Sequence, residues 1–280
     1  MRLTYRHLAA AVVAALTSLT LSGCQGSDLP MPPNGPSGQS FSTNNALIRV
    51  VNGSPTAGIA SAGCPSTCID VVVDGSVIAR GVPYPAASAL DAFAILPYVS
   101  VPSGAVLIQI FQSGTSTPVF EPTTPLVLSA GKKYSFVIAG NAPLPPPAPA
   151  FFPGFLFNDG LFNSPFGGTM ADFHNASPNA GSLQFFVTCT ACTAGGQNIG
   201  SPVGVGGIAG PVSLVPSANY VFNASNAATM SLAASALNGT NTGGVLPDPF
   251  GKPNVSIYAV DTAGLGSANF QLIGVEDSNG

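Results

Sequence analysis

The sequence is poor in charge, lacks tryptophan and has almost no histidine. Only 6% of its 280 residues are charged, whereas about a quarter are charged in an average globular protein. Acidic residues outnumber basic ones by 11 to 7. So little positive charge offers no surface for a phosphate backbone, and we expect no nucleic-acid partner.

Histidine occurs twice, and His174 is the only one beyond the N-terminal segment. A chain with so little imidazole has few ways to build an acid–base pair or a catalytic triad. We expect His174 to be a solvated side chain at the end of a strand. An enzyme is therefore the least favoured function for this chain.

Glycine and proline are abundant, with 33 and 27 residues. This composition argues against long helices and predicts many turns. Short runs of alternating apolar residues, separated by turn signals, indicate strands throughout.

The N-terminal segment has the pattern of an export signal. Arg2 and Arg6 precede an apolar run at residues 8–19 that is too short to span a bilayer. The following Leu21-Ser22-Gly23-Cys24 resembles the lipobox of bacterial lipoproteins. That resemblance implies cleavage after residue 23 and a lipid on the Cys24 thiol, and Gln25 resembles an outer-membrane sorting signal. The alternative is an ordinary signal peptide with a chance cysteine.

We therefore expect a protein held in the cell envelope by its lipid, with the outer membrane as the expected location. Residues 24–45 are rich in proline, glycine, serine and asparagine. This composition predicts a flexible linker between the lipid and the folded part.

The folded part contains a repeated motif. Residues 48–55 return in altered form at residues 171–178, and in each a short strand runs into Asn-x-Ser-Pro. Asparagine and proline at these positions end a strand and turn the chain. We expect two tandem immunoglobulin-like β-sandwich domains, at residues 46–168 and 169–280.

Two hairpins are expected in the first repeat. Val73-Asp74-Gly75-Ser76 predicts a two-residue turn. A second hairpin is expected to join residues 126–128 to residues 134–138 through a turn at Ala130-Gly131.

Residues 48–55, Ile69-Asp70-Val71-Val72-Val73-Asp74-Gly75 and residues 128–134 resemble a bacterial domain of unknown function, DUF4397. The resemblance implies an exported or lipid-anchored protein, often with repeated domains, and assigns no activity. It is clearer in the first repeat than in the second.

Four cysteines follow Cys24, in the close pairs Cys64/Cys68 and Cys189/Cys192. Four thiols allow three pairings. The oxidising envelope and the short spacing favour two local disulfides. A zinc site built from all four sulfurs and a redox role for the CxxC pair are the alternatives.

Other residues considered for binding are acidic or glycine-rich. Asp70, Asp74 and Asp91 could contribute to calcium binding, but their spacing fits no known loop, so we expect solvated acids. Residues 204–209 fit a dinucleotide-binding fingerprint, but the prolines on either side leave no helix to follow it. We expect no cofactor and no metal.

Aromatic residues follow a proline-rich stretch at residues 143–149. We expect this stretch to lead into packing between the repeats, with an exposed partner surface of Phe151, Phe152 and Phe155 as the alternative. The favoured function is a non-catalytic interaction or structural module whose partner is an envelope protein or glycan. The alternative is a binding protein for a glycan or small ligand.

Overall fold

The computed structural model describes residues 44–58, 64, 67–84, 97–141, 152–159, 169–189, 197–214, 220–227, 237–238, 254–262 and 270–277. These residues form strands and turns and no helix, so the described protein is all-β. Accordingly, no described residue belongs to a helix capable of crossing a membrane. We call residues 44–159 the N-terminal half and residues 169–277 the C-terminal half.

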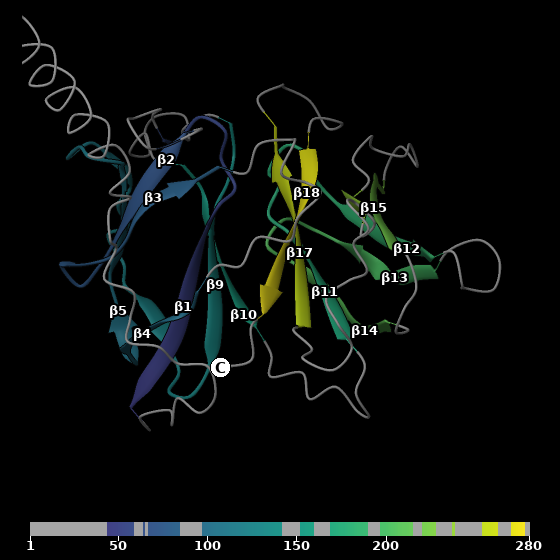
Figure 1. The fold of residues 1–280 in the computed structure, drawn as a ribbon, viewed down its shortest axis with the longest axis horizontal. Coiled ribbons are helices and arrows are strands. Elements are labelled where there is room, and N and C mark those ends of the chain that lie inside the picture. Colours follow the sequence, from purple (N-terminus) through teal and green to yellow (C-terminus); the bar gives the residue numbers. More distant parts are fainter. Residues whose placement is uncertain are drawn as a thin grey trace, which may run out of the picture. The chain divides into compact units, whose positions relative to one another are not determined.

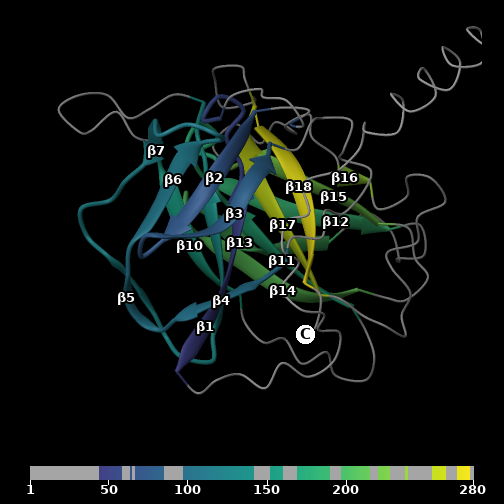
Figure 2. The same ribbon diagram turned by 60° about the vertical axis from the view of Figure 1, so that its left-hand side comes forward.

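The N-terminal half contains two four-stranded sheets and one two-stranded sheet. The first sheet has the order β10-β9-β1-β4, and the second has the order β3-β2-β6-β7 (Figures 1 and 2). Strands β5 and β8 form the separate pair. The strands are β1 (Asn45–Asn52), β2 (Cys68–Val73), β3 (Ser76–Pro83), β4 (Val99–Pro102), β5 (Gly104–Val106), β6 (Ile108–Gln112), β7 (Pro118–Phe120), β8 (Leu126–Leu128), β9 (Lys133–Ile138) and β10 (Gly154–Asp159).

The two larger sheets enclose one apolar core. Ile48 and Phe136 from the first sheet pack in the same cluster as Val71 and Ile110 from the second. The predicted β2–β3 hairpin is confirmed, because Val73 pairs with Ser76. Asp74 and Gly75 between them have positive φ angles of 48° and 78°, as a two-residue hairpin turn of this twist requires.

The predicted hairpin between residues 126–128 and 134–138 is wrong. Strand β8 pairs with β5, whereas β9 lies parallel to β1 and antiparallel to β10. Gly131 does turn the chain, with a φ of 70°, but its N–H donates to the Asn45 carbonyl. The turn therefore delivers β9 to the side of β1 instead of folding it back on β8.

The C-terminal half contains two more four-stranded sheets, with the orders β14-β11-β17-β18 and β13-β12-β15-β16. These match the two larger sheets of the N-terminal half strand for strand, and the parallel pair β11–β17 matches β1–β9. The strands are β11 (Thr169–Asn175), β12 (Leu183–Cys189), β13 (Gln197–Val203), β14 (Ile208–Leu214), β15 (Tyr220–Asn226), β16 (Leu237–Asn238), β17 (Asn254–Asp261) and β18 (Phe270–Asp277).

The turn that follows the first strand is built in the same way in both halves. The Asn52 side chain accepts the Ser54 N–H at 3.3 Å and donates to the Thr67 and Val82 carbonyls. The Asn175 side chain likewise accepts from the Ser177 N–H, at 3.2 Å, and it donates to two carbonyls, those of Gly181 and Val203. The repeated Asn-x-Ser-Pro motif is therefore a strand-ending turn anchored by its asparagine.

The central strands are buried on both faces. One face of β1, β9 and β17 contributes to the core of its own half, and the other face contributes to a third cluster shared by the halves. The approach is close, because a Cβ atom on Gly53 would lie 2.7 Å from Cγ1 of Val260. This shared cluster contains Val51, Val137, Ala139, Phe157, Ala176, Tyr258, Val260, Ile273 and Val275.

Candidate functional site

Polar side chains gather on the faces of β1, β9, β10, β11 and β17 that the halves share. Side chains alternate along a strand, so Arg49 lies on the same face as Val51 and Asp172 on the same face as His174. Such residues would normally face water, but here the other half of the chain covers each of these faces. The buried polar cluster consists of Arg49, Ser135, Asp159, Asp172, His174, Ser256 and Tyr258, each at most 2% exposed.

Arg49 is the centre of one part of this cluster. Its Nε donates to Ser135 Oγ at 2.6 Å, and its Nη2 donates to the Tyr258 hydroxyl at 2.8 Å. The hydrogen bonds continue through the hydroxyl groups: Tyr258 donates to Ser135, and Ser135 donates to Asp159 Oδ2 at 2.5 Å. Tyr98 also donates to that carboxylate oxygen, which lies 3.7 Å from Arg49 Nη2. The Arg49 charge is therefore compensated by the Asp159 carboxylate within a hydrogen-bonded network.

His174 and Asp172 form the other part. The His174 Nε2 atom lies 3.0 Å from Asp172 Oδ1, and neither ring nitrogen makes an aligned hydrogen bond among the described residues. The imidazole stacks on the Tyr258 ring at 4.6 Å and meets the Phe157 ring edge-on at 4.7 Å. The prediction of a solvated His174 is wrong, because the N-terminal half covers this face of β11.

The pKa of Asp172 is held below its usual range. Burial of the carboxyl group raises the pKa, but the His174 charge, the Ser256 hydroxyl and the Arg49 charge together outweigh it. The Asp172 carboxylate is therefore charged in the folded protein and depends on partners from both halves.

A second polar contact between the halves involves Tyr84. Its hydroxyl donates to the Asp261 carbonyl at 3.0 Å and accepts from Gln271 Nε2 at 2.7 Å. Burial and the nearby Asp261 carboxyl group raise the pKa of Tyr84 to about 12, against the opposing effect of Gln271. The Asp261 carboxyl group accepts hydrogen bonds from Ser177 and from Asn179 Nδ2, but its burial still raises its pKa.

Asp70 on β2 links strand β3 to the turn that follows β6. Its carboxylate accepts the N–H groups of Gly81 and Gly114, at 2.8 and 3.0 Å, and the Ser113 hydroxyl at 2.8 Å. Burial raises the pKa of Asp70, but these hydrogen bonds and the Arg80 charge lower it overall. At 9% exposure the predicted solvated acid is wrong for Asp70, because its oxygens satisfy backbone donors.

Of the other candidate calcium ligands, only Asp74 belongs to the part of the chain that the structure describes. Asp74 is exposed and accepts the Leu107 N–H at 2.8 Å, and Asp91 lies outside the described residues. Over the described ranges, no three or more His, Cys, Asp and Glu side chains group as metal ligands. Residues 204–207 form a turn that leads into strand β14, so the rejection of the dinucleotide fingerprint is confirmed.

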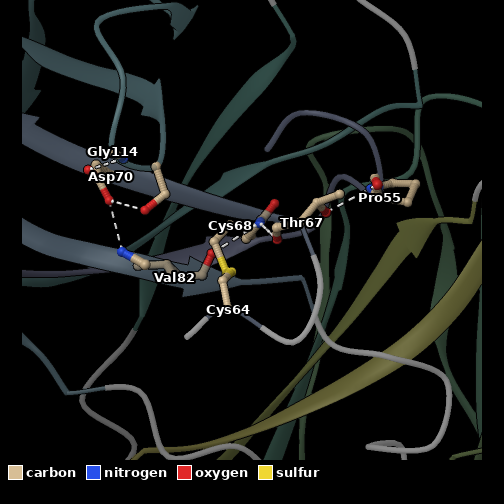
Figure 3. The surroundings of a disulfide bond; sticks show 10 residues. Pro55, Cys64, Thr67, Cys68, Asp70, Val82 and Gly114 are labelled. Carbon is tan, nitrogen blue, oxygen red and sulfur yellow. Dashed lines mark hydrogen bonds between the residues drawn. A yellow bond between two sulfur atoms is a disulfide. The ribbon is translucent and has the colours of Figure 1, made fainter. Parts of the chain in front are cut away.

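Cys64 and Cys68 are joined in a disulfide, with their Cα atoms 6.3 Å apart (Figure 3). Figure 3 also places Thr67 beside Cys68, and the Thr67 carbonyl is one of the two that hold the Asn52 amide. The bridge therefore lies next to the anchored turn. The Cys189 side chain and the residues Cys24 and Cys192 lie outside those that the structure describes.

Phe152 does not form part of an exposed aromatic surface, the alternative that the sequence left open. It is 8% exposed and packs in the core of the N-terminal half. Phe155 is half-buried against the cluster shared by the halves, as expected for packing between repeats. Phe151 lies outside the described residues.

Sequence reasoning missed Arg49, Asp159 and Tyr258. The available signal was the charge of Arg49 within the apolar strand Asn45–Asn52, since a charge in a buried strand requires a buried partner. Nothing local identified the partners, because Tyr258 lies 209 residues away.

No curated protein matches the chain. A family model described as "Domain of unknown function (DUF4397)" matches residues 46–186 in a single span. The match begins in β1, continues through the rest of the N-terminal half and ends in β12. It covers half of the sequence, and the chain therefore belongs to the DUF4397 family.

Proposed function

We propose that this protein is a lipid-anchored, non-catalytic module of the cell envelope. The observation that carries the proposal is the position of His174, Asp159 and Asp172. All three are at most 2% exposed and are held between two sheets. A general acid or base must come within hydrogen-bonding distance of a substrate proton, and these groups are covered by protein side chains, with Asp159 held by Ser135 and Tyr98 and His174 packed between Tyr258 and Phe157.

We further propose that the halves are tandem β-sandwiches, with residues 46–168 and 169–280 as the two repeats. The matching strand orders and the matching Asn52 and Asn175 turns support this organisation. The sandwich is better supported than its immunoglobulin-like type. The parallel β1–β9 and β11–β17 pairs depart from the antiparallel pairing of immunoglobulin domains.

The anchor is proposed from the sequence around Cys24. Two or three acyl chains would anchor the protein stably in a membrane, whereas one chain binds only marginally and reversibly. A flexible linker at residues 24–45 would then present the folded part to an envelope protein or glycan.

The anchor is tested by labelling cells with a fatty-acid analogue and fractionating their membranes. Wild-type protein should carry the label and sediment with membranes. The Cys24→Ser variant should be unlabelled, and it should be released or remain unprocessed. A correctly cleaved Cys24→Ser variant that stays with the membrane would contradict the proposal.

The non-catalytic role is tested with the double variant Asp172→Asn/His174→Phe in a strain that lacks the protein. An apolar ring at position 174 can pack between Phe157 and Tyr258, and well-packed apolar replacements of buried charges are often neutral. The variant should restore the wild-type phenotype wherever its thermal stability matches that of the wild type. Loss of the phenotype at unchanged stability would instead assign chemistry to this pair.

A further inference from the structure

The two halves meet through equivalent faces. The ladders define equivalent positions, because Arg49 pairs with Ser135 in the N-terminal half as Asp172 pairs with Ser256 in the C-terminal half. By the same registers Val137 is equivalent to Tyr258. Phe155 and Phe157 are likewise equivalent to Ile273 and Val275.

Both members of these pairs lie at the shared interface. Val137, Ala139 and Phe157 belong to the same apolar cluster as their counterparts Tyr258, Val260 and Val275. An interface in which each partner uses the same patch is isologous, the arrangement typical of two-fold symmetric dimers. The halves therefore contact each other as two copies of a homodimer would.

The loops after β3 and β13 repeat this reciprocity. Tyr84, just after β3, reaches across to bond Gln271 and the Asp261 carbonyl. Gly206, just after β13, lies against the other half in return, since a Cβ there would be 3.5 Å from Cδ1 of Phe155. Each half thus places a residue that follows its third strand, Tyr84 or Gly206, against the other half.

The polar residues break this symmetry. Arg49 has Asp172 as its counterpart, and Tyr258 has Val137. The Arg49 guanidinium bonds the Tyr258 hydroxyl at 2.8 Å, a group that the N-terminal half lacks at position 137. Two N-terminal halves packed in this way would bury two arginines that each keep Asp159 but lose that hydroxyl, and a buried charged donor that loses its acceptor is destabilising.

We propose that the two halves form an isologous pair within one chain. Arg49 and Tyr258 make the face of each half specific for the other half, so that neither face pairs well with the same half of a second molecule. The pair rests on the proposed two-repeat organisation. Its consequence is that the β1–β9–β10 face is closed to outside partners. An envelope partner must use the outer sheets or the loops.

The test is a double-mutant cycle in the full chain, purified in detergent and unfolded with urea. Arg49→Met and Tyr258→Phe should each lower the urea midpoint, and the double variant should lose less than the sum of the two losses. Such coupling is expected when two residues share one interaction. Native mass measurement should also show that the wild-type chain is a monomer.

The matched control is Tyr134→Phe. The Tyr134 hydroxyl accepts the Ser129 N–H at 3.0 Å within the N-terminal half, so its loss should add to that of Arg49→Met without coupling. If Arg49→Met does not fold, Arg49→Lys replaces it, because lysine keeps the charge and lacks the fork of donors.

The proposal would be overturned if the losses in urea midpoint for Arg49→Met and Tyr258→Phe were additive. It would also be overturned if the wild-type chain self-associated through the β1–β9–β10 face. Neither result would bear on the lipid anchor or on complementation by the Asp172→Asn/His174→Phe variant. Failure of the pairing and failure of the proposed function are therefore distinguishable.

Discussion

Arg49 and Tyr258 lie 209 residues apart in the sequence, and the Arg49 guanidinium donates a hydrogen bond to the Tyr258 hydroxyl at 2.8 Å. Both side chains are fully buried, at 1% and 0% exposure. The Arg49 charge is compensated by Asp159 of its own half, but an arrangement without the Tyr258 hydroxyl would remove an acceptor from a buried charged donor, which is costly. We infer that this contact specifies how the two halves meet.

Replacing Asp172 with asparagine should destabilise the protein in a pH-dependent way. Removing a buried charge from the partners that compensate it costs about 3–5 kcal/mol, and the whole of this loss should appear above the unfolded-state Asp172 pKa of 3.8. Because the folded-state pKa is lowered, the contribution of Asp172 disappears as the pH falls through that folded value. Urea unfolding of the wild type and of Asp172→Asn across this pH range measures the difference between their free energies of unfolding. That difference should become smaller in acid.

The exposed Asp74→Asn variant is the control for this measurement. It should remain within about 1 kcal/mol of the wild type. A gap between Asp172→Asn and the wild type that stays constant down to strongly acidic pH would contradict the assignment of charge to Asp172.

Tyr84 should be among the last tyrosines to ionise. Its pKa is raised to about 12, so the neutral hydroxyl is favoured in the folded state. The corresponding stability is present below the ordinary pKa of 10.0 and is lost as the pH rises through the folded value. Phenolate absorbance should show one late-titrating group that Tyr84→Phe removes. If the variant keeps the late step, another tyrosine carries it.

The anchored turns should be about equally sensitive in the two halves. Asn52→Ala and Asn175→Ala each leave two partly buried carbonyls without their side-chain donor. We expect each to lower the free energy of unfolding by about 2–3 kcal/mol. Aspartate at either position keeps the acceptor and loses both donors, so it should restore only part of the loss. Wild-type urea midpoints for both alanine variants would contradict the proposed role of the turn.

The disulfide should make a modest contribution. Cys64→Ser/Cys68→Ser should lower the free energy of unfolding by about 2 kcal/mol, because the loop that this bridge closes is short. Peptide mapping without reduction should find Cys64–Cys68, and the sequence predicts Cys189–Cys192 in the same map. A bridge between the two pairs would contradict the local pairing.

The features that could be predicted from the sequence are local ones. The Asp74-Gly75 hairpin depends on two residues that tolerate positive φ. The two Asn-x-Ser-Pro turns depend on an asparagine that bonds its own backbone. Such signals act within a few residues, and they do not depend on how the rest of the chain packs.

The features that could not be predicted depend on what covers the second face of a strand. Arg49, Asp172 and His174 alternate with apolar residues, which is the usual pattern of a solvated face. Only the packing of the other half shows that this face is buried. The parallel pairing of β9 with β1 was also hidden, because parallel strands are joined by long connections with no local turn signal.

Scanning calorimetry of the full chain tests most directly whether the buried polar cluster joins the two halves into one folding unit. The interface predicts a single transition in which the calorimetric enthalpy equals the van't Hoff enthalpy. Two separate transitions, or a calorimetric enthalpy about twice the van't Hoff value, would show that the halves unfold independently and would contradict the account.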